Sequence, residues 1–124
     1  MKKLIATKGA PAAIGPYSQA VEVNGFLYVS GQIPIDPATG LIPQGIEAQT
    51  EQVLKNMGAI LQEAGMSYKN VVKTTCLLTD ISNFGAMNEV YAKYFVEELP
   101  ARAAFAVVAL PKGVLVEIEC VASR

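Results

Sequence analysis

Residues 103–110 form an unbroken apolar run, Ala-Ala-Phe-Ala-Val-Val-Ala-Leu. The run is far shorter than the roughly 18 residues of a membrane-spanning helix, and its β-branched and aromatic side chains favour a strand. A strand that is apolar at every position has no face suited to water. The chain must therefore cover both faces, one with its own helices and the other with a second copy of the same sheet. This requirement predicts a symmetric homo-oligomer.

Two further elements are predicted in the first half of the chain. Asn24-Gly25 separates the β-prone residues 18–23 and 26–30, and this dipeptide is the strongest short-range hairpin signal because both turn residues take a positive φ. A helix is predicted over residues 46–64, where apolar side chains recur every three or four positions until Gly65 ends it.

The second half continues with a strand at 71–78, a helix that Ser82 caps and Pro100 closes, and strands at 103–110 and 114–122. The last two strands are joined by a short turn, so we expect hairpins at both ends of the chain. The order β-β-α-β-α-β-β predicts an α+β fold in which two helices cover one face of a single mixed sheet.

Length and charge narrow the range of functions. The 124 residues (13.2 kDa) suit one domain, 1–124. Ten basic and 11 acidic residues give a net charge of −1, which argues against a nucleic-acid binder. Without histidine, and with only two distant cysteines, no metal site is expected. Cys76 and Cys120 look like core thiols of a reducing compartment, and Lys8 interrupts the N-terminal apolar stretch before a signal peptide forms. We therefore expect a cytoplasmic protein with no membrane association.

Two charged features stand out in the C-terminal strands. Arg102 precedes the apolar run, where it either packs its stem and reaches water or offers a guanidinium fork to a carboxylate. Glu117 and Glu119 alternate with apolar residues, so both lie on one strand face. That face is either solvated, or one glutamate is partly buried with a raised pKa and transfers protons. If the last two strands form a hairpin, Arg102 and Glu117 lie near one rim.

A third candidate group lies at the ends of the first hairpin. Tyr17 precedes its first strand, and Ser30 and Gly31 end its second strand. The hairpin brings these ends together, so a phenol, a hydroxyl and an approachable backbone amide converge there. The alternative is ordinary turn chemistry, and the residues alone leave both roles open.

Five short motifs occur in order along the chain: Gly15-Pro16-Tyr17-Ser18-Gln19-Ala20, Val29-Ser30-Gly31-Gln32-Ile33-Pro34, Asn88-Glu89-Val90-Tyr91, Pro100-Ala101-Arg102, and Pro111-Lys112-Gly113 leading to Val116-Glu117-Ile118-Glu119. Each is weak alone, but their joint order and spacing resemble the RidA/YjgF family of enamine/imine deaminases. Relatives carry the older name L-PSP or "translation initiation inhibitor" family. The resemblance runs from about Tyr17 to the C-terminus.

The resemblance implies a chorismate-mutase-like fold, with sheets closing into a central barrel in a homotrimer and ligand clefts between neighbouring subunits. It implies that 2-aminoacrylate-type enamines and imines, such as 2-iminobutanoate and 2-iminopropanoate, are hydrolysed to 2-keto acids and ammonia. Pyridoxal-phosphate-dependent dehydratases release such intermediates. No cofactor or metal is implied.

The resemblance also implies roles for individual residues. Arg102 matches the arginine that binds the substrate carboxylate, Glu117 the acidic residue that places or activates water, and Tyr17 the tyrosine of the cleft. These three are the expected catalytic residues. Many family members carry a cysteine two residues after the arginine, where this chain has Ala104, so a reactive-thiol role is not expected.

Four more residues are expected to bind substrate. Ser30 and Gly31 match positions whose backbone lines the cleft, and Phe84 and Asn88 match positions at its edge. Two other functions remain open at this point. A non-catalytic sensor of small carboxylates would need Arg102 but not Glu117. An RNA-directed translation inhibitor or ribonuclease would need a basic surface, which the charge balance disfavours.

Overall fold

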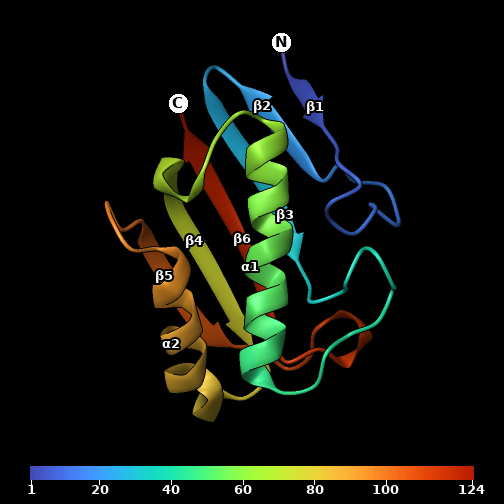
Figure 1. Cartoon of the computed structure of the whole chain (residues 1–124), viewed down its shortest axis with the longest axis vertical. Coiled ribbons are helices and arrows are strands. Elements are labelled where there is room, and N and C mark those ends of the chain that lie inside the picture. The colour runs from blue at the N-terminus through green and yellow to red at the C-terminus, as the bar shows by residue number, and fades with distance from the viewer.

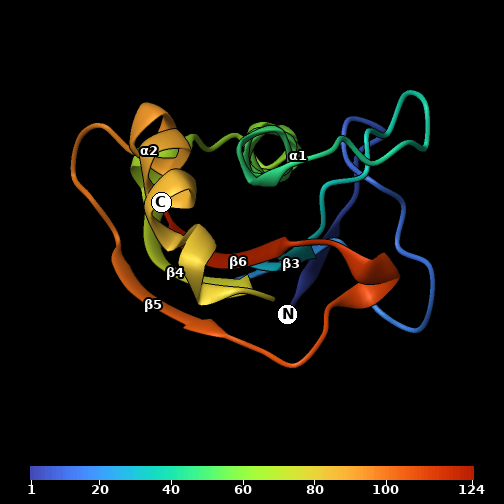
Figure 2. The same cartoon turned by 90° about the horizontal axis from the view of Figure 1, so that it is seen from below.

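The computed structural model describes residues 1–124 as a six-stranded mixed sheet with two α-helices packed on one face (Figures 1 and 2). The strand order across the sheet is β1-β2-β3-β6-β4-β5. The predicted α+β class, with both helices on one side of a single mixed sheet, is confirmed. The elements are β1 (Lys3–Ile5), β2 (Ala20–Val23), β3 (Phe26–Gln32), α1 (Ile46–Glu63), β4 (Val71–Leu78), α2 (Phe84–Tyr94), β5 (Ala101–Ala106) and β6 (Val116–Ser123).

The locally encoded elements form as predicted. Asn24 (φ 52°) and Gly25 (φ 81°) make the tight turn between β2 and β3, which pair antiparallel. At the end of α1, Gly65 adopts a φ of 74°, and the Met66 N–H donates to the Leu61 carbonyl at 2.8 Å. This bond, characteristic of a Schellman motif, satisfies a carbonyl that the helix leaves free.

One strand was not predicted. β1 pairs antiparallel with β2, with Leu4 opposite Val21. Only Ile5 of its three residues is buried. A three-residue strand at a sheet edge has too short a hydrophobic pattern to stand out in the sequence.

The predicted C-terminal hairpin is wrong. β5 runs parallel to β4 at the edge of the sheet, and β6 lies between β3 and β4, antiparallel to both. β4, α2 and β5 form a crossover unit, a connection that brings the second strand in parallel beside the first. β5 also ends at Ala106, so residues 107–110 of the apolar run do not belong to it.

Both predicted boundaries of α2 are also wrong. Asp80, not Ser82, acts as the cap: its Oδ1 accepts the Ser82 N–H at 2.9 Å and starts a 3₁₀ turn before α2. The helix ends at Tyr94, well before Pro100. Phe95 is already extended, and its ring is buried 4.5 Å from that of Tyr91, so packing of Phe95 into the core ends the helix.

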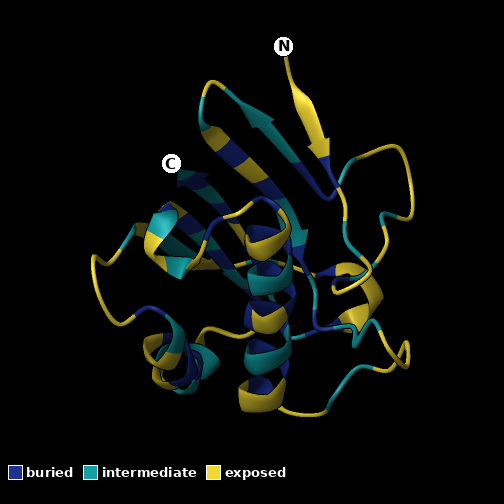
Figure 3. Cartoon of the chain, turned by 45° about the horizontal axis from the view of Figure 1, so that its top comes forward, coloured by how far each residue is buried: buried dark blue, intermediate teal, exposed yellow.

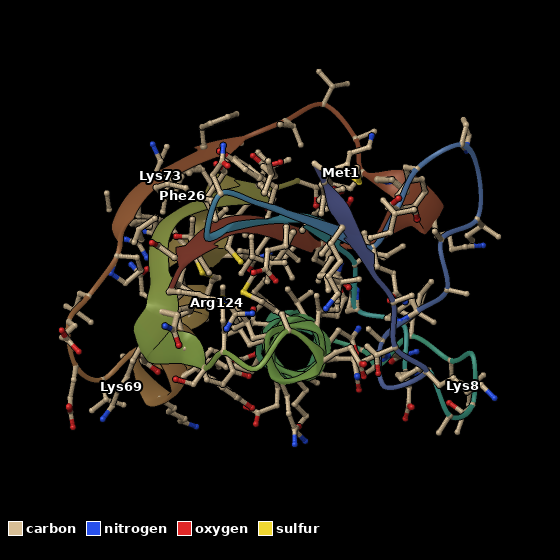
Figure 4. All side chains as sticks on the ribbon, turned by 90° about the horizontal axis from the view of Figure 1, so that it is seen from above. Met1, Lys8, Phe26, Lys69, Lys73 and Arg124 are labelled. Atoms are coloured by element: carbon tan, nitrogen blue, oxygen red, sulfur yellow. The ribbon has the colours of Figure 1, made fainter.

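The two faces of the sheet differ in burial (Figure 3). Its helix-facing side joins α1 and α2 in a cluster of 23 buried residues. The opposite side, here called the open face, exposes large apolar side chains: Tyr28 (49%), Phe105 (48%) and Phe26 (41%), the last of which Figure 4 labels away from α1. Neither helix is long and apolar enough to cross a membrane.

Candidate active site

Arg102 lies on the helix-facing side of β5, beneath α2. Its Nη1 donates to Asn88 Oδ1 at 2.7 Å, and its Cζ lies 5.3 Å from the ring centroid of Phe84 and 4.9 Å from that of Tyr91. The crossover from β4 through α2 to β5 places these α2 side chains over the arginine. Three of the predicted site residues, Arg102, Asn88 and Phe84, are therefore brought together.

This arrangement leaves part of the guanidinium free. A guanidinium has five N–H donors in a planar fork, and Asn88 accepts one of them. The edge formed by Nε and Nη2 makes no hydrogen bond within the chain, so it can bind both oxygens of a carboxylate. Arg102 is itself exposed, which makes that edge accessible.

The other predicted residues line a cavity of about 500 Å³ at the end of the first hairpin. Tyr17, Ser30, Gly31 and Glu117 all contribute to its wall. The predicted convergence of the two hairpin ends is therefore found. The Ser30 hydroxyl is not free, however, because it donates to the Ser18 carbonyl at 2.6 Å and fastens the two ends together.

Two buried amide side chains hold the loops around this cavity, and sequence reasoning missed both. Gln19 accepts the Thr7 N–H at 2.7 Å and donates to the Pro11 carbonyl at 2.8 Å. Asn56, fully buried on α1, donates to the carbonyls of Ile33 and Ile35 at 3.2 and 3.0 Å. The position of Asn56 on the apolar face of the predicted helix could have identified it, because a buried amide needs hydrogen-bond partners from another segment.

Glu117 approaches Gly31 closely. A Cβ atom built on Gly31 overlaps the Glu117 carboxylate, so only glycine leaves room for the carboxylate in its present position. Burial raises the pKa of Glu117, and the nearby charge of Glu119 raises it further. A raised pKa makes this carboxyl group easier to protonate than an ordinary glutamate, which suits a group that takes up and releases protons.

We expect Gly31→Ala to fold normally, because only the flexible end of the Glu117 side chain has to move to make room for the methyl group. The same movement displaces the Glu117 carboxylate, so activity should fall about tenfold or more. Steady-state kinetics and urea unfolding would measure the two effects. Gly85→Ala on α2, where an added Cβ meets nothing within 4 Å, is the matched control. Unchanged activity of Gly31→Ala would show that the position of the carboxylate is unimportant.

The two groups of site residues lie on opposite faces of the sheet. Arg102 is in register with Thr74, which is buried against α2, whereas Glu117 is opposite Leu77 and alternates with residues that face the helices. Side chains one position apart along a strand point to opposite faces. The prediction that Arg102 and Glu117 of one chain share a rim is therefore wrong, because it assumed a hairpin that does not form.

Comparisons with known proteins fit this geometry. A family model described as endoribonuclease L-PSP matches residues 7–124. A mouse protein named 2-iminobutanoate/2-iminopropanoate deaminase is 54% identical over 123 residues, covering 98% of this chain and 91% of its own. The structure of a Rid-family protein from Yersinia pestis, 53% identical, superposes with a TM-score of 0.97 over 100% of both chains.

A third relative was solved with a small ligand. The structure of Escherichia coli TdcF with bound serine has a TM-score of 0.95, is 42% identical and covers 98% of each chain. The matches extend across both helices and the sheet, including the elements that carry Arg102 and Glu117. The chain therefore belongs to the L-PSP family, which includes the Rid proteins.

Proposed function

We propose that this protein is a 2-iminobutanoate/2-iminopropanoate deaminase, which hydrolyses small 2-imino acids and their enamines to 2-keto acids and ammonia. The observation that carries the proposal is the free Nε–Nη2 edge of Arg102, oriented by Asn88, in a chain 54% identical to a deaminase of that name. The serine bound to the relative from Escherichia coli is likewise a small carboxylate. Phe84 and Asn88 form the edge of the substrate site.

Only protein side chains and water take part in the proposed reaction. Arg102 binds the substrate carboxylate, and Tyr17 and the Ser30-Gly31 backbone line the cleft. The enamine accepts a proton on its terminal carbon and gives one up from nitrogen, and so becomes the imine. Glu117 then removes one proton from water as the water oxygen bonds to the imine carbon, and passes it to the nitrogen to give a carbinolamine. It next removes the hydroxyl proton of the carbinolamine and passes that to the nitrogen as the C–N bond breaks and ammonia leaves. The water oxygen remains as the keto group.

The same proposal includes assembly as a homotrimer, with open faces lining a central barrel and clefts between subunits. Arg102 and Glu117 face opposite sides of one sheet, so a cleft that contains both needs two chains. The exposed Tyr28 and Phe105 support burial of the open face. So does the low charged fraction of 17%.

Two further properties belong to the proposal. All of residues 1–124 act as one cytoplasmic domain, which is supported by the 23-residue cluster and by the free, buried thiols of Cys76 and Cys120.

RNA is not a substrate, because the net charge is −1 and both Glu117 and Glu119 line the cavity. Steep salt dependence of RNA binding would contradict this.

Mixing two inactive variants tests both the activity and the shared cleft. Wild type should accelerate ammonia release from threonine in the presence of threonine dehydratase, and Arg102→Ala and Glu117→Gln should each lose most of that acceleration. After equal mixing and reassembly, about one cleft in four should combine an intact arginine with an intact glutamate, restoring about a quarter of the activity. No recovery on mixing would contradict the intersubunit cleft, and an inactive wild type would contradict the function.

A further inference from the structure

Tyr91 lies directly against the Arg102 guanidinium and is itself held in place. Its side chain is 8% exposed, and its ring centroid is 4.9 Å from Arg102 Cζ. The ring also packs against Phe95, with the two centroids 4.5 Å apart. The Tyr91 hydroxyl is hydrogen-bonded to Thr74 Oγ1 at 2.7 Å.

The bond to Thr74 ties the ring to the strand next to Arg102. Thr74 is fully buried on β4 and is the register partner of Arg102 on β5. The hydrogen bond fixes the position of the Tyr91 hydroxyl, and packing against Phe95 restricts rotation of the ring about its long axis. The cation–π contact therefore places Arg102 against a ring that is held from both α2 and β4.

Asn88 lies one helical turn before Tyr91, so both residues face the same part of β5. A planar group that rests on a ring and donates one in-plane hydrogen bond is fixed in both tilt and rotation. The rings of Tyr91 and Phe84 lie 4.9 and 5.3 Å from Arg102 Cζ and restrict the tilt of the guanidinium, and the hydrogen bond to Asn88 Oδ1 restricts its rotation.

We propose that Tyr91, anchored by Thr74, is a positioning residue that holds the Nε–Nη2 edge of Arg102 ready for the substrate carboxylate. The inference rests on the proposed function, because it assigns Arg102 to carboxylate binding. Tyr91 does not contact the reacting atoms. Its loss should therefore weaken binding of substrate and product equally and leave the chemical step unchanged.

The test measures Tyr91→Leu in two backgrounds. With Arg102 intact, KM for the imine and the Kd for 2-oxobutanoate should rise between about threefold and thirtyfold, with kcat within about twofold of wild type. In the Arg102→Lys background the same change should raise either constant by less than about twofold, because no planar guanidinium remains to be oriented. A merely structural role would produce equal effects in both backgrounds and would overturn the inference.

Tyr68→Leu is the matched control, since the Tyr68 ring also packs on Phe95, at 5.5 Å, but does not contact Arg102. It should lower stability while leaving KM and Kd unchanged. Tyr91→Phe and Thr74→Val retain the ring and lose only its anchor, so each should give a smaller rise than Tyr91→Leu. If Tyr91→Leu does not fold, Tyr91→Phe and Thr74→Val test the positioning role instead. Unchanged KM and Kd in both variants would overturn the inference.

The binding measurement separates this inference from the proposed function. If wild type binds 2-oxobutanoate but does not hydrolyse imines, the deaminase proposal fails, while the Kd values still test Tyr91. If wild type is active and Arg102→Lys raises KM while Tyr91→Leu does not, only the positioning role of Tyr91 is overturned.

Discussion

Arg102→Lys is expected to lower kcat/KM for the imine about 100-fold, mainly through KM. Lysine keeps the positive charge but cannot form two parallel hydrogen bonds to one carboxylate. It also loses the planar group that rests between Asn88 and Tyr91. A charge-assisted hydrogen bond contributes about 1.5–3 kcal/mol, which corresponds to about 10- to 150-fold in affinity.

The measurement is ammonia release coupled to threonine dehydratase, over a range of imine supply. Arg124→Lys is a matched control, because Arg124 is the only other arginine of the chain. It pairs with Glu22 at 2.9 Å and donates to the Ala64 carbonyl, away from the site residues. If Arg102→Lys behaves like Arg124→Lys, the carboxylate does not bind at Arg102.

Glu117→Gln is expected to lower kcat by between about 10²- and 10⁴-fold, the usual contribution of a group that transfers protons. Glutamine keeps the shape of the side chain beside Gly31 but cannot accept a proton from water. In wild type, activity should fall as the pH drops through the raised pKa of Glu117, and the variant should lack this acid limb. Full activity of Glu117→Gln would assign proton transfer to solvent.

The same substitution should stabilise the protein at neutral pH. Burial raises the pKa of Glu117 in the folded chain above the unfolded value of about 4.3, so in the interval between the two pKa values the folded state binds the extra proton. Wild-type stability therefore falls as pH rises through that interval. The gain of Glu117→Gln over wild type in urea unfolding should be present at pH 7 and vanish below about pH 4.

Glu119→Gln is the control for this pair of measurements. Glu119 is exposed, and its charge contributes to the raised pKa of Glu117. Removing that charge should move the acid limb to lower pH and leave the maximal rate unchanged. Loss of the maximal rate in Glu119→Gln would show that the proton-transfer role had been assigned to the wrong glutamate.

Local chemistry explains which parts of the fold were predictable. The Asn24-Gly25 turn and the Gly65 helix end need backbone conformations that few other residues adopt, so neighbouring residues are enough to identify them. The predicted cap at Ser82 failed because Asp80, two residues earlier, offers a competing acceptor. The predicted helix end at Pro100 failed because burial of Phe95, a tertiary contact, ended α2 first.

In the candidate site, too, the sequence identified individual residues but not the tertiary contacts between them. Motifs and residue types were enough to select Arg102, Glu117 and Tyr17 and to expect a small carboxylate as ligand. They could not show that Gly31 leaves room for the Glu117 carboxylate, or that Tyr91 and Asn88 hold the guanidinium. These contacts join residues that are far apart along the chain, so no local pattern encodes them.

The sequence by itself determined the reactive groups and the local elements of this protein: the Arg102 guanidinium, the Glu117 carboxyl group, the first hairpin and the two helices. Only the tertiary structure decided how these parts are distributed. β6 is inserted between β3 and β4 and leaves β5 at the edge, which places Arg102 and Glu117 on opposite faces of the sheet. Strand order depends on which distant segments pair most favourably in the whole fold, whereas turns and helix ends depend on the conformational preferences of a few adjacent residues.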